Sequence, residues 1–339
     1  MGIRENALSV LKKTKGIDFK VIEKEVNRAN LYYTKDQQLE SSLQANRKIV
    51  EVTIYKKCGD KLGKHTFPLV TDVKKDINEK IKDAIRYSLS LDDEAAVNNF
   101  FAFYRSKFLF FSAEMFDISS EMLLDCAKGI EYIHTSSLVL DDLPSMDNSA
   151  LRRGKESTHS KYGQDIAILT ALYLLVEGQK LIINNGAKLG DVSSINVSLA
   201  KTLKLEGLIG GQARDLTWKH KDVSDYLKTY FMKNRLIEFS ILLPTLLCKP
   251  FAFNKDLEFF AKNISTAYQI HDDLRDQITS DMTGKSEKKD SKKLSNLSSN
   301  DEMIAMRDDL IKKSINRIKP IQNSKNLINF TEYIFYRRV

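Results

Sequence analysis

The sequence predicts an all-α protein, and three observations support this prediction. Apolar residues recur with helical spacing (i, i+3, i+4, i+7) in three long segments, residues 121–140, 165–183 and 196–211. Only 5 prolines and 14 glycines interrupt the chain of 339 residues. Strand patterns with hairpin turns are nearly absent after residue 75, so we expect successive helices to pack on one another as a bundle.

The N-terminal part of the sequence departs from this helical pattern. Residues 48–57, KIVEVTIYKK, alternate apolar and polar side chains and lead into CGDKLGK, which is typical of a strand and a turn, and we leave this piece unassigned. Residues 1–47 are rich in lysine, and residues 279–301 have the polar composition of a loop. We therefore expect an N-terminal extension of unassigned structure over residues 1–74 and one helical domain over residues 75–339.

The composition narrows the class of partner. A hydrophobic content of 42% is enough to bury a substantial core, which excludes disorder over the whole length. The net charge of +8 favours an anionic partner, and nucleic acid, acidic lipid and a phosphorylated small molecule all fit that condition. Charge alone does not choose among these three.

Cysteine usage and hydropathy set the expected location. The three cysteines show no metal-binding or disulfide spacing, which favours a reducing compartment. We expect no membrane span, because no run approaches roughly 20 consecutive apolar residues. The N-terminus lacks the apolar segment of a secretory signal, so we expect a cytoplasmic protein. Organellar targeting stays the alternative, although Glu5 and Asp18 count against it.

An acidic cluster follows an apolar segment at 268-YQIHDDLRD-276. Asp272 and Asp276 are four residues apart, so on a helix their carboxylates lie on one face, with Asp273 beside them. Like charges this close need a cation between them. Carboxylate oxygens without histidine or thiolate suit Mg²⁺, which binds one or two carboxylates together with substrate phosphates.

A second acidic cluster, earlier in the chain, lies in 139-VLDDLPSMDNSALRRGKESTH-159. Asp141 and Asp147 are six residues apart and off-phase on a regular helix, but Pro144 breaks the helix and can bring them to one site. Arg152 and Arg153 follow at once. Either cluster alone could be a solvated helix end, whereas the pair indicates a diphosphate site with several metal ions.

These two motifs closely resemble the aspartate-rich motifs of the trans-isoprenyl diphosphate synthases, the farnesyl and geranylgeranyl diphosphate synthase family. The resemblance runs from about residue 75 to the C-terminus and includes 211-GQARDL-216, Lys233, 284-GKSEKKD-290 and 332-EYIFYRR-338. It implies a helical bundle of the isoprenoid synthase type around a central cavity. It also implies a homodimer that joins an allylic diphosphate to isopentenyl diphosphate with three Mg²⁺ ions.

The same resemblance assigns roles to individual residues. Direct metal ligands are expected at Asp141, Asp147 and Asp272. Ligands or supports of ligands are expected at Asp142, Asp273 and Asp276. Residues that match contacts to the allylic diphosphate are Arg152, Lys233, Gln269 and Lys285, with Gln212 and Asp215 supporting the site.

The isopentenyl diphosphate site is where this sequence departs most from the family. Phe100, Phe101 and Ala102 replace two glycines and a lysine of the family's motif, so only Arg105, His134 and Arg153 match that site. Lys107 is a candidate to restore the missing charge. Milder departures are Ser149 and Ala150 in place of acidic residues, Leu172 in place of aspartate and Asn234 in place of threonine.

Chain length in this family follows the bulk of the residues one turn before the first motif. Ser136 and Ser137 occupy that turn and are small, so we expect a product of about 20 carbons, geranylgeranyl diphosphate. Phe110 or Tyr132 could fill the same space.

Three other interpretations remain open. One is a relative that ionises the allylic diphosphate but uses another acceptor or cyclises it, and another is a non-catalytic partner subunit. The third is a nucleic-acid or interaction module, which explains less. We expect no nucleic-acid partner, because no recognition motif is present and basic residues mix with acidic ones.

Overall fold

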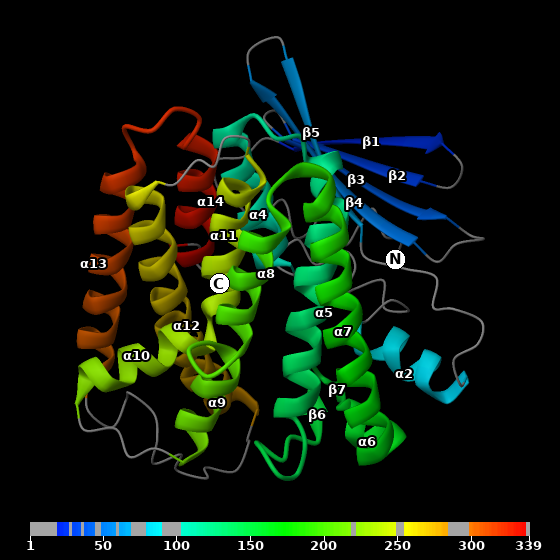
Figure 1. Ribbon diagram of the computed structural model, residues 1–339, viewed down its shortest axis with the longest axis vertical. Coiled ribbons are helices and arrows are strands. Elements are labelled where there is room, and N and C mark those ends of the chain that lie inside the picture. Colours follow the sequence, from blue (N-terminus) through cyan, green and yellow to red (C-terminus); the bar gives the residue numbers. More distant parts are fainter. Residues whose placement is uncertain are drawn as a thin grey trace. The chain divides into compact units, whose positions relative to one another are not determined.

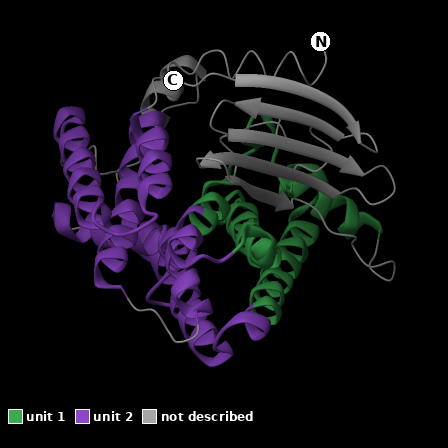
Figure 2. Cartoon of the chain, turned by 90° about the horizontal axis from the view of Figure 1, so that it is seen from above, with its two compact units in different colours: residues 1–110, 119–185 green, residues 111–118, 186–339 purple. Residues whose placement is uncertain are grey.

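The computed structural model describes two compact units (Figure 2), unit 1 with Met1–Phe110 and Ser119–Asn185 and unit 2 with Phe111–Ile118 and Gly186–Val339. Side chains are described for residues 79–89, 103–217, 222–248, 254–275 and 298–336. For five N-terminal strands and for residues 276–283, only the backbone is described.

The N-terminal extension contains an antiparallel sheet, which the sequence left unassigned. Its order follows the chain, β1-β2-β3-β4-β5, with neighbouring strands paired (Figure 1). The alternating segment at residues 48–57 forms β4, and it pairs with β5 through partners such as Val52 and Phe67. The strand bounds are β1 (Phe19–Val26), β2 (Ala29–Thr34), β3 (Gln37–Gln44), β4 (Ile49–Cys58) and β5 (Lys61–Pro68).

The described residues of unit 1 after the extension are mainly helical, with one short hairpin, in agreement with the all-α class. The elements of this part are α2 (Glu79–Ser88), α4 (Tyr104–Ala113), η2 (Ser120–Leu123), α5 (Leu124–Asp141), β6 (Leu151–Arg152), β7 (Lys155–Glu156), α6 (Thr158–Tyr162) and α7 (Gln164–Leu189). The last residues of α4 and of α7 are counted with unit 2.

Helices α5 and α7 pack at a very close backbone approach. A Cβ atom added to Gly129 would lie 2.5 Å from the carbonyl oxygen of Gly178, and one added to Gly178 would lie 2.7 Å from that of Gly129. Only glycine allows this distance. Near the C-terminal end of α5, Val139, Ala167 and Ala171 form an apolar cluster with Leu143. This cluster lies directly beneath the turn that carries the first acidic motif.

Unit 2 contains the second acidic motif on its longest helix. The helices are η1 (Glu114–Phe116), α8 (Val192–Leu203), α9 (Leu208–Thr217), α10 (Val223–Lys233), α11 (Arg235–Leu247), α12 (Lys255–Thr283), α13 (Asn300–Ile318) and α14 (Lys325–Tyr336) (Figure 1). An apolar cluster joins α10, α12 and α13 through Tyr226, Tyr230, Ile270, Leu274 and Met303. The packing of Ile270 and Leu274 in this cluster holds α12 in place where it carries the acidic residues.

Helix α7 is long and apolar enough to cross a membrane, judged by length and composition alone. Among the residues that the structure describes, it is the one helix with this property. It also contributes buried side chains to unit 1, including Leu174 and Ile182. A core helix of this kind meets the same length and composition test.

Candidate active site

The first acidic motif begins where α5 ends. The helix stops at Asp141, and Asp142 caps it, two residues before Pro144, as the proline predicts. The chain then folds back, and the amide of Asp147 donates to the carbonyl of Asp141 at 2.9 Å. The amide of Ser149 donates to the carbonyl of Asp142 at 3.1 Å. The turn therefore brings the two ends of the motif together, as the sequence predicts.

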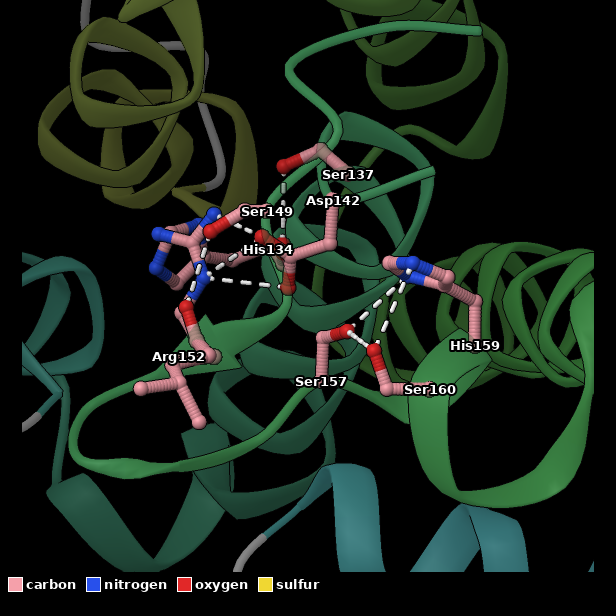
Figure 3. Close-up of polar contacts among 9 residues, drawn as sticks. His134, Ser137, Asp142, Ser149, Arg152, Ser157, His159 and Ser160 are labelled. Carbon is pink, nitrogen blue, oxygen red and sulfur yellow. Dashed lines mark hydrogen bonds and ion pairs between the residues drawn. The ribbon is translucent and has the colours of Figure 1, made fainter. Parts of the chain in front are cut away.

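A bidentate ion pair connects this motif to the arginines that follow it. Arg152 Nε lies 3.0 and 3.1 Å from the two carboxylate oxygens of Asp142, and Nη2 lies 2.5 Å from Oδ1 (Figure 3). Asp142 is buried, whereas the side chain of Arg152 is 38% exposed. One side of the guanidinium thus holds Asp142 while part of it stays open to solvent.

All three aspartates of the motif act on the pKa of Arg152. Burial alone would lower the pKa of the guanidinium, but the hydrogen bond to Asp142 and the charges of Asp142, Asp141 and Asp147 outweigh burial and raise it. Arg152 therefore stays fully charged. Arg152 thus holds Asp142 directly, and Leu143 of the same turn packs in the apolar cluster with Val139, Ala167 and Ala171.

The hairpin that carries Arg152 is fixed at its base. The amide of Ser157 donates to the carbonyl of Ala150 at 2.8 Å. The Ser157 hydroxyl lies 2.9 Å from His159 Nδ1 and 2.9 Å from the Ser160 hydroxyl (Figure 3). At the tip, Arg153 has φ 53° and Gly154 has φ 78°. The tight turn between β6 and β7 thus presents consecutive arginines.

His134 lies among three arginines on the same unit. Burial holds the pKa of its imidazole well below the usual value, and the charges of Arg105, Arg153 and Arg152 lower it further. The imidazole is therefore neutral at physiological pH. Arg105 is itself buried, on α4. This group contains the residues that match the family's isopentenyl diphosphate site, and its positive charge suits a second anionic group.

Lys107 is buried two residues beyond Arg105. Burial lowers the pKa of its ammonium to about 7, and the charge of Glu131 partly offsets this. Glu131 accepts hydrogen bonds from the amide and hydroxyl of Ser106, at 3.0 and 2.6 Å. Lys107 is thus a buried cation on the same helix as Arg105, but at neutral pH it is only partly charged.

The second acidic motif lies on α12 in unit 2. Asp273 is buried, and its Oδ1 accepts from Gln269 Nε2 at 2.9 Å. Its Oδ2 accepts from the hydroxyl of Tyr230 on α10. Asp272 is more exposed and accepts from Arg275 at 2.7 Å. The side chain of Asp276 lies outside the described residues.

Lys233 is positioned at the end of α10 by two features of α9. Its ammonium lies 2.6 Å from Asp215 Oδ2. Gly211 permits the close approach, because a Cβ atom there would lie 2.6 Å from the amide nitrogen of Lys233. Within the described part of the chain, the buried Nε2 of Gln212 has no hydrogen-bond partner. A buried donor without a partner is suited to an acceptor group of a ligand.

The structure groups the expected site residues by unit. Unit 1 brings together Asp141, Asp142, Asp147, Arg152, Arg153, His134 and Arg105. Unit 2 contains Gln212, Asp215, Lys233, Gln269, Asp272 and Asp273. Lys285, Phe100, Phe101 and Ala102 lie outside the described residues.

Sequence analysis missed Tyr230, which binds Asp273, and Glu131, which lies near Lys107. The hydrogen bond of Tyr230 joins residues 43 positions apart. One signal in the sequence indicates Tyr230, since it shares a helical face with Lys233 and Asn234, three and four residues later.

The donors fit Mg²⁺. Both motifs offer carboxylates, the oxygen ligands that this cation prefers, and Gln212 leaves a buried amide for the phosphate that accompanies it. Within the described residues, no three acidic, histidine or cysteine side chains converge on one point. Mg²⁺ does not require such a group, because it keeps water and substrate phosphate among its ligands.

Solved structures resemble the chain in fold. A geranyltransferase from Legionella pneumophila aligns with a TM-score of 0.65 at 20% identity, covering 78% of this chain and 90% of that one. A farnesyl/geranylfarnesyl diphosphate (FPP/GFPP) synthase from Zymomonas mobilis aligns with a TM-score of 0.63 at 23% identity, covering 78% and 91%. At these identities the likeness shows the fold, a helical isoprenoid synthase type.

Sequence relatives carry more specific names. A geranylgeranyl diphosphate synthase from Cyanophora paradoxa is 35% identical over 222 residues, 62% of this chain and 71% of the relative. One from Pseudescherichia vulneris is 36% identical over 183 residues, 52% and 58%. A farnesyl diphosphate synthase from Geobacillus stearothermophilus is 34% identical over 160 residues, 45% and 54%. The last two alignments thus span little more than half of the relatives' lengths.

The fold is that of helical isoprenoid synthases, and the chain has two acidic motifs. The polyprenyl synthetase family model matches residues 102–298, more than half of the chain and both acidic motifs. The chain belongs to the polyprenyl synthetase family.

Proposed function

We propose that the chain is a Mg²⁺-dependent trans-prenyltransferase, which condenses an allylic diphosphate with isopentenyl diphosphate. The observation that carries this proposal is the turn at the end of α5, where Arg152 forms a bidentate ion pair with Asp142, the backbones of Asp141 and Asp147 meet, and Leu143 packs in an apolar cluster. It combines diphosphate-binding charge with an apolar surface for a hydrocarbon tail. The names of the sequence relatives support the same reaction.

The residues of the chain suit the steps of this reaction. Arg152 and Lys233 are fixed cations that stabilise the departing diphosphate as the allylic cation develops. The chemistry that Mg²⁺ supplies when bound is neutralisation of that leaving group. The cationic group of Arg105, Arg153 and the neutral His134 binds the diphosphate of the second substrate. Three Mg²⁺ ions are the number we propose.

The test is product formation by the purified chain. Dimethylallyl, geranyl and farnesyl diphosphate are each incubated with isopentenyl diphosphate and Mg²⁺, and products are identified by chromatography and mass spectrometry. We expect chain elongation that EDTA abolishes and added Mg²⁺ restores. Consumption of the allylic substrate without incorporation of isopentenyl diphosphate would instead identify an enzyme with another acceptor or a cyclase. If no diphosphate is consumed, the chain is a non-catalytic subunit.

Geranylgeranyl diphosphate is the product we propose, and the structure refines the reason. Ser136 is buried, and its hydroxyl donates to the carbonyl of Ala171 on α7 at 2.8 Å. Ser137 is only partly buried, and its hydroxyl donates within α5 to the carbonyl of His134 at 2.8 Å. Ser136 therefore belongs to the contact between α5 and α7, and Ser137 is the position whose bulk is free to limit the product.

The experiment compares the products of the wild type and of Ser137→Phe. An aromatic ring at this position is expected to shorten the product by at least one five-carbon unit. Ser137→Ala serves as the matched control and retains the wild-type length. Identical products from Ser137→Phe and the wild type would show that the bulk of residue 137 does not limit the product length.

A homodimer is the assembly we propose, with α7 in its interface. Ile168, Leu172 and Val176 follow one another at intervals of four residues, and all three are exposed, as is Leu169. Exposed aliphatic side chains in one stripe favour a self-complementary contact with a second copy. Leu172→Asp is expected to give a monomer in analytical ultracentrifugation, whereas Ile304→Asp, at an isolated exposed aliphatic residue on α13, leaves the dimer intact.

A further inference from the structure

A buried polar network joins α10 to the acidic face of α12 within unit 2. The hydroxyl of Tyr230 donates to Asp273 Oδ2, and both residues are almost fully buried. Gln269 Nε2 donates to the other oxygen, Oδ1, at 2.9 Å. Both carboxylate oxygens of Asp273 therefore have donors from the protein.

The amide of Gln269 is oriented by one further residue. Asn234 Nδ2 donates to Gln269 Oε1 at 2.7 Å, which directs the amide nitrogen of Gln269 toward Asp273. Asn234 is buried and caps the C-terminal end of α10, directly after Lys233. The network therefore runs from Asn234 through Gln269 to Asp273 and returns to α10 at Tyr230.

The donors in this network carry no charge. An ionised carboxylate that accepts from two buried donors is held in one orientation, and removing one donor leaves a buried oxygen without its partner. Tyr230 also packs in the apolar cluster with Ile270 and Leu274, on either side of the acidic pair. The rotation of α12 about its axis is thus fixed where Asp272 and Asp273 begin the motif.

We infer that Tyr230 and Asn234 are positioning residues, which orient the second acidic motif through Asp273 and Gln269. This inference rests on the proposed function, since it concerns how that motif binds Mg²⁺ with diphosphate. Both roles rest on hydrogen bonds seen in this chain.

The test measures metal affinity directly and not only turnover. Mn²⁺ binding to the full chain is followed by electron paramagnetic resonance with inorganic diphosphate present, for the wild type and for Tyr230→Phe. We expect about a 10-fold weaker Mn²⁺ affinity in the variant, the size typical of lost hydrogen bonds to metal ligands. Tyr226→Phe is the matched control, since Tyr226 is a buried tyrosine one turn earlier on α10 and packs edge-on against Tyr230.

Asn234→Ala is the second variant and covers the case in which Tyr230→Phe folds poorly. It leaves the Tyr230 contact in place and is expected to weaken Mn²⁺ binding about 3-fold or more, because Gln269 loses its orienting donor. Thermal unfolding is measured in parallel. A lower melting temperature with unchanged Mn²⁺ affinity in both variants would show a merely structural role and overturn the inference.

The same experiment separates this inference from the proposed function. If the wild type binds Mn²⁺ and diphosphate but does not elongate an allylic substrate, the proposed function fails, while weaker binding in the variants still supports the positioning role. If the wild type elongates its substrate and both variants bind Mn²⁺ as it does, the inference alone fails. Absence of any Mn²⁺ binding in the wild type overturns both.

Discussion

The two acidic motifs are supported in different ways. In unit 1, Asp142 is held by Arg152, a cation whose side chain is 38% exposed. In unit 2, Asp273 is held by Tyr230 and Gln269, which are uncharged, and the tyrosine is almost fully buried. In the function that we propose, the first support also binds the anionic substrate, whereas the second only orients its carboxylate.

This difference indicates two kinds of preorganisation. An arginine shared between a carboxylate and a substrate phosphate adjusts its contacts when the substrate binds, because its fork of donors can serve both. A buried network of neutral donors is complete before any ligand arrives. Substitutions at the first motif should therefore act on substrate binding and chemistry together, and those behind the second motif on metal affinity.

The largest effect is expected from the aspartates themselves. Asp141→Ala or Asp272→Ala removes a carboxylate needed while the leaving diphosphate gains charge, so kcat/KM should fall by about 1,000-fold or more. Asp125→Ala is the matched control, because this residue lies in the first turn of α5, near Lys128. Either motif variant with nearly wild-type kcat/KM would show that its motif does not take part.

A smaller loss is expected at the charged support. Arg152→Lys keeps the charge but cannot form the bidentate contact to Asp142, so kcat/KM for the allylic diphosphate should fall by roughly 100-fold. Arg317→Lys, at a surface ion pair with Asp256, is the control and should stay within about 2-fold. If Arg152→Lys lowers kcat/KM for the allylic diphosphate less than Tyr230→Phe does, the distinction between the two supports is wrong.

The next prediction concerns the effect of the buried Lys107 on the free energy of unfolding. Burial lowers the pKa of its ammonium from the usual 10.5 to about 7 in the folded chain. Between these two pH values, the unfolded chain therefore binds more protons than the folded chain. Stability should therefore rise as pH increases from 7 toward 10. Lys107→Met should flatten that part of the profile and be more stable at pH 7 by about 1–3 kcal/mol.

Urea unfolding at several pH values measures this effect. If the free energy of unfolding of Lys107→Met rises with pH as steeply as that of the wild type, another group causes the pH dependence. Assays of the same variant give a second result, since a raised KM for isopentenyl diphosphate is expected if Lys107 restores the charge missing at Ala102.

The smallest effect concerns the pH dependence of activity. Because burial and the charges of three arginines hold the pKa of His134 well below its usual value, its imidazole is expected to stay neutral in the pH range where an ordinary histidine titrates. His134→Gln should raise the KM for isopentenyl diphosphate but leave the shape of the pH profile unchanged in that range. A wild-type inflection near pH 6.5 that disappears in the variant would contradict the neutral imidazole.

Local sequence pattern accounts for one part of this structure. The apolar spacing predicts α5 and α7, Pro144 predicts the end of α5, and the four-residue spacing places Asp272 on one face of α12. Helix period and proline geometry act over a few residues, so they can be read directly.

Contacts between distant segments account for the rest. The hydroxyl of Ser136 meets α7 because of how two helices pack, and Tyr230 meets Asp273 across 43 residues. The hairpin strands β6 and β7 have 2 residues each, too few for an alternating pattern. These features depend on tertiary packing, which a single sequence does not encode in its local periodicity.

The most direct test of the account is Mg²⁺-dependent binding of an unreactive allylic diphosphate. Farnesyl thiolodiphosphate is titrated into the wild type, Asp141→Ala and Asp272→Ala by calorimetry, with Mg²⁺ or with EDTA. We expect tight binding only for the wild type with Mg²⁺, and a loss of at least 10-fold in each variant. Equal affinity in EDTA, or wild-type affinity in both variants, would contradict the claim that the two motifs bind Mg²⁺ with the diphosphate.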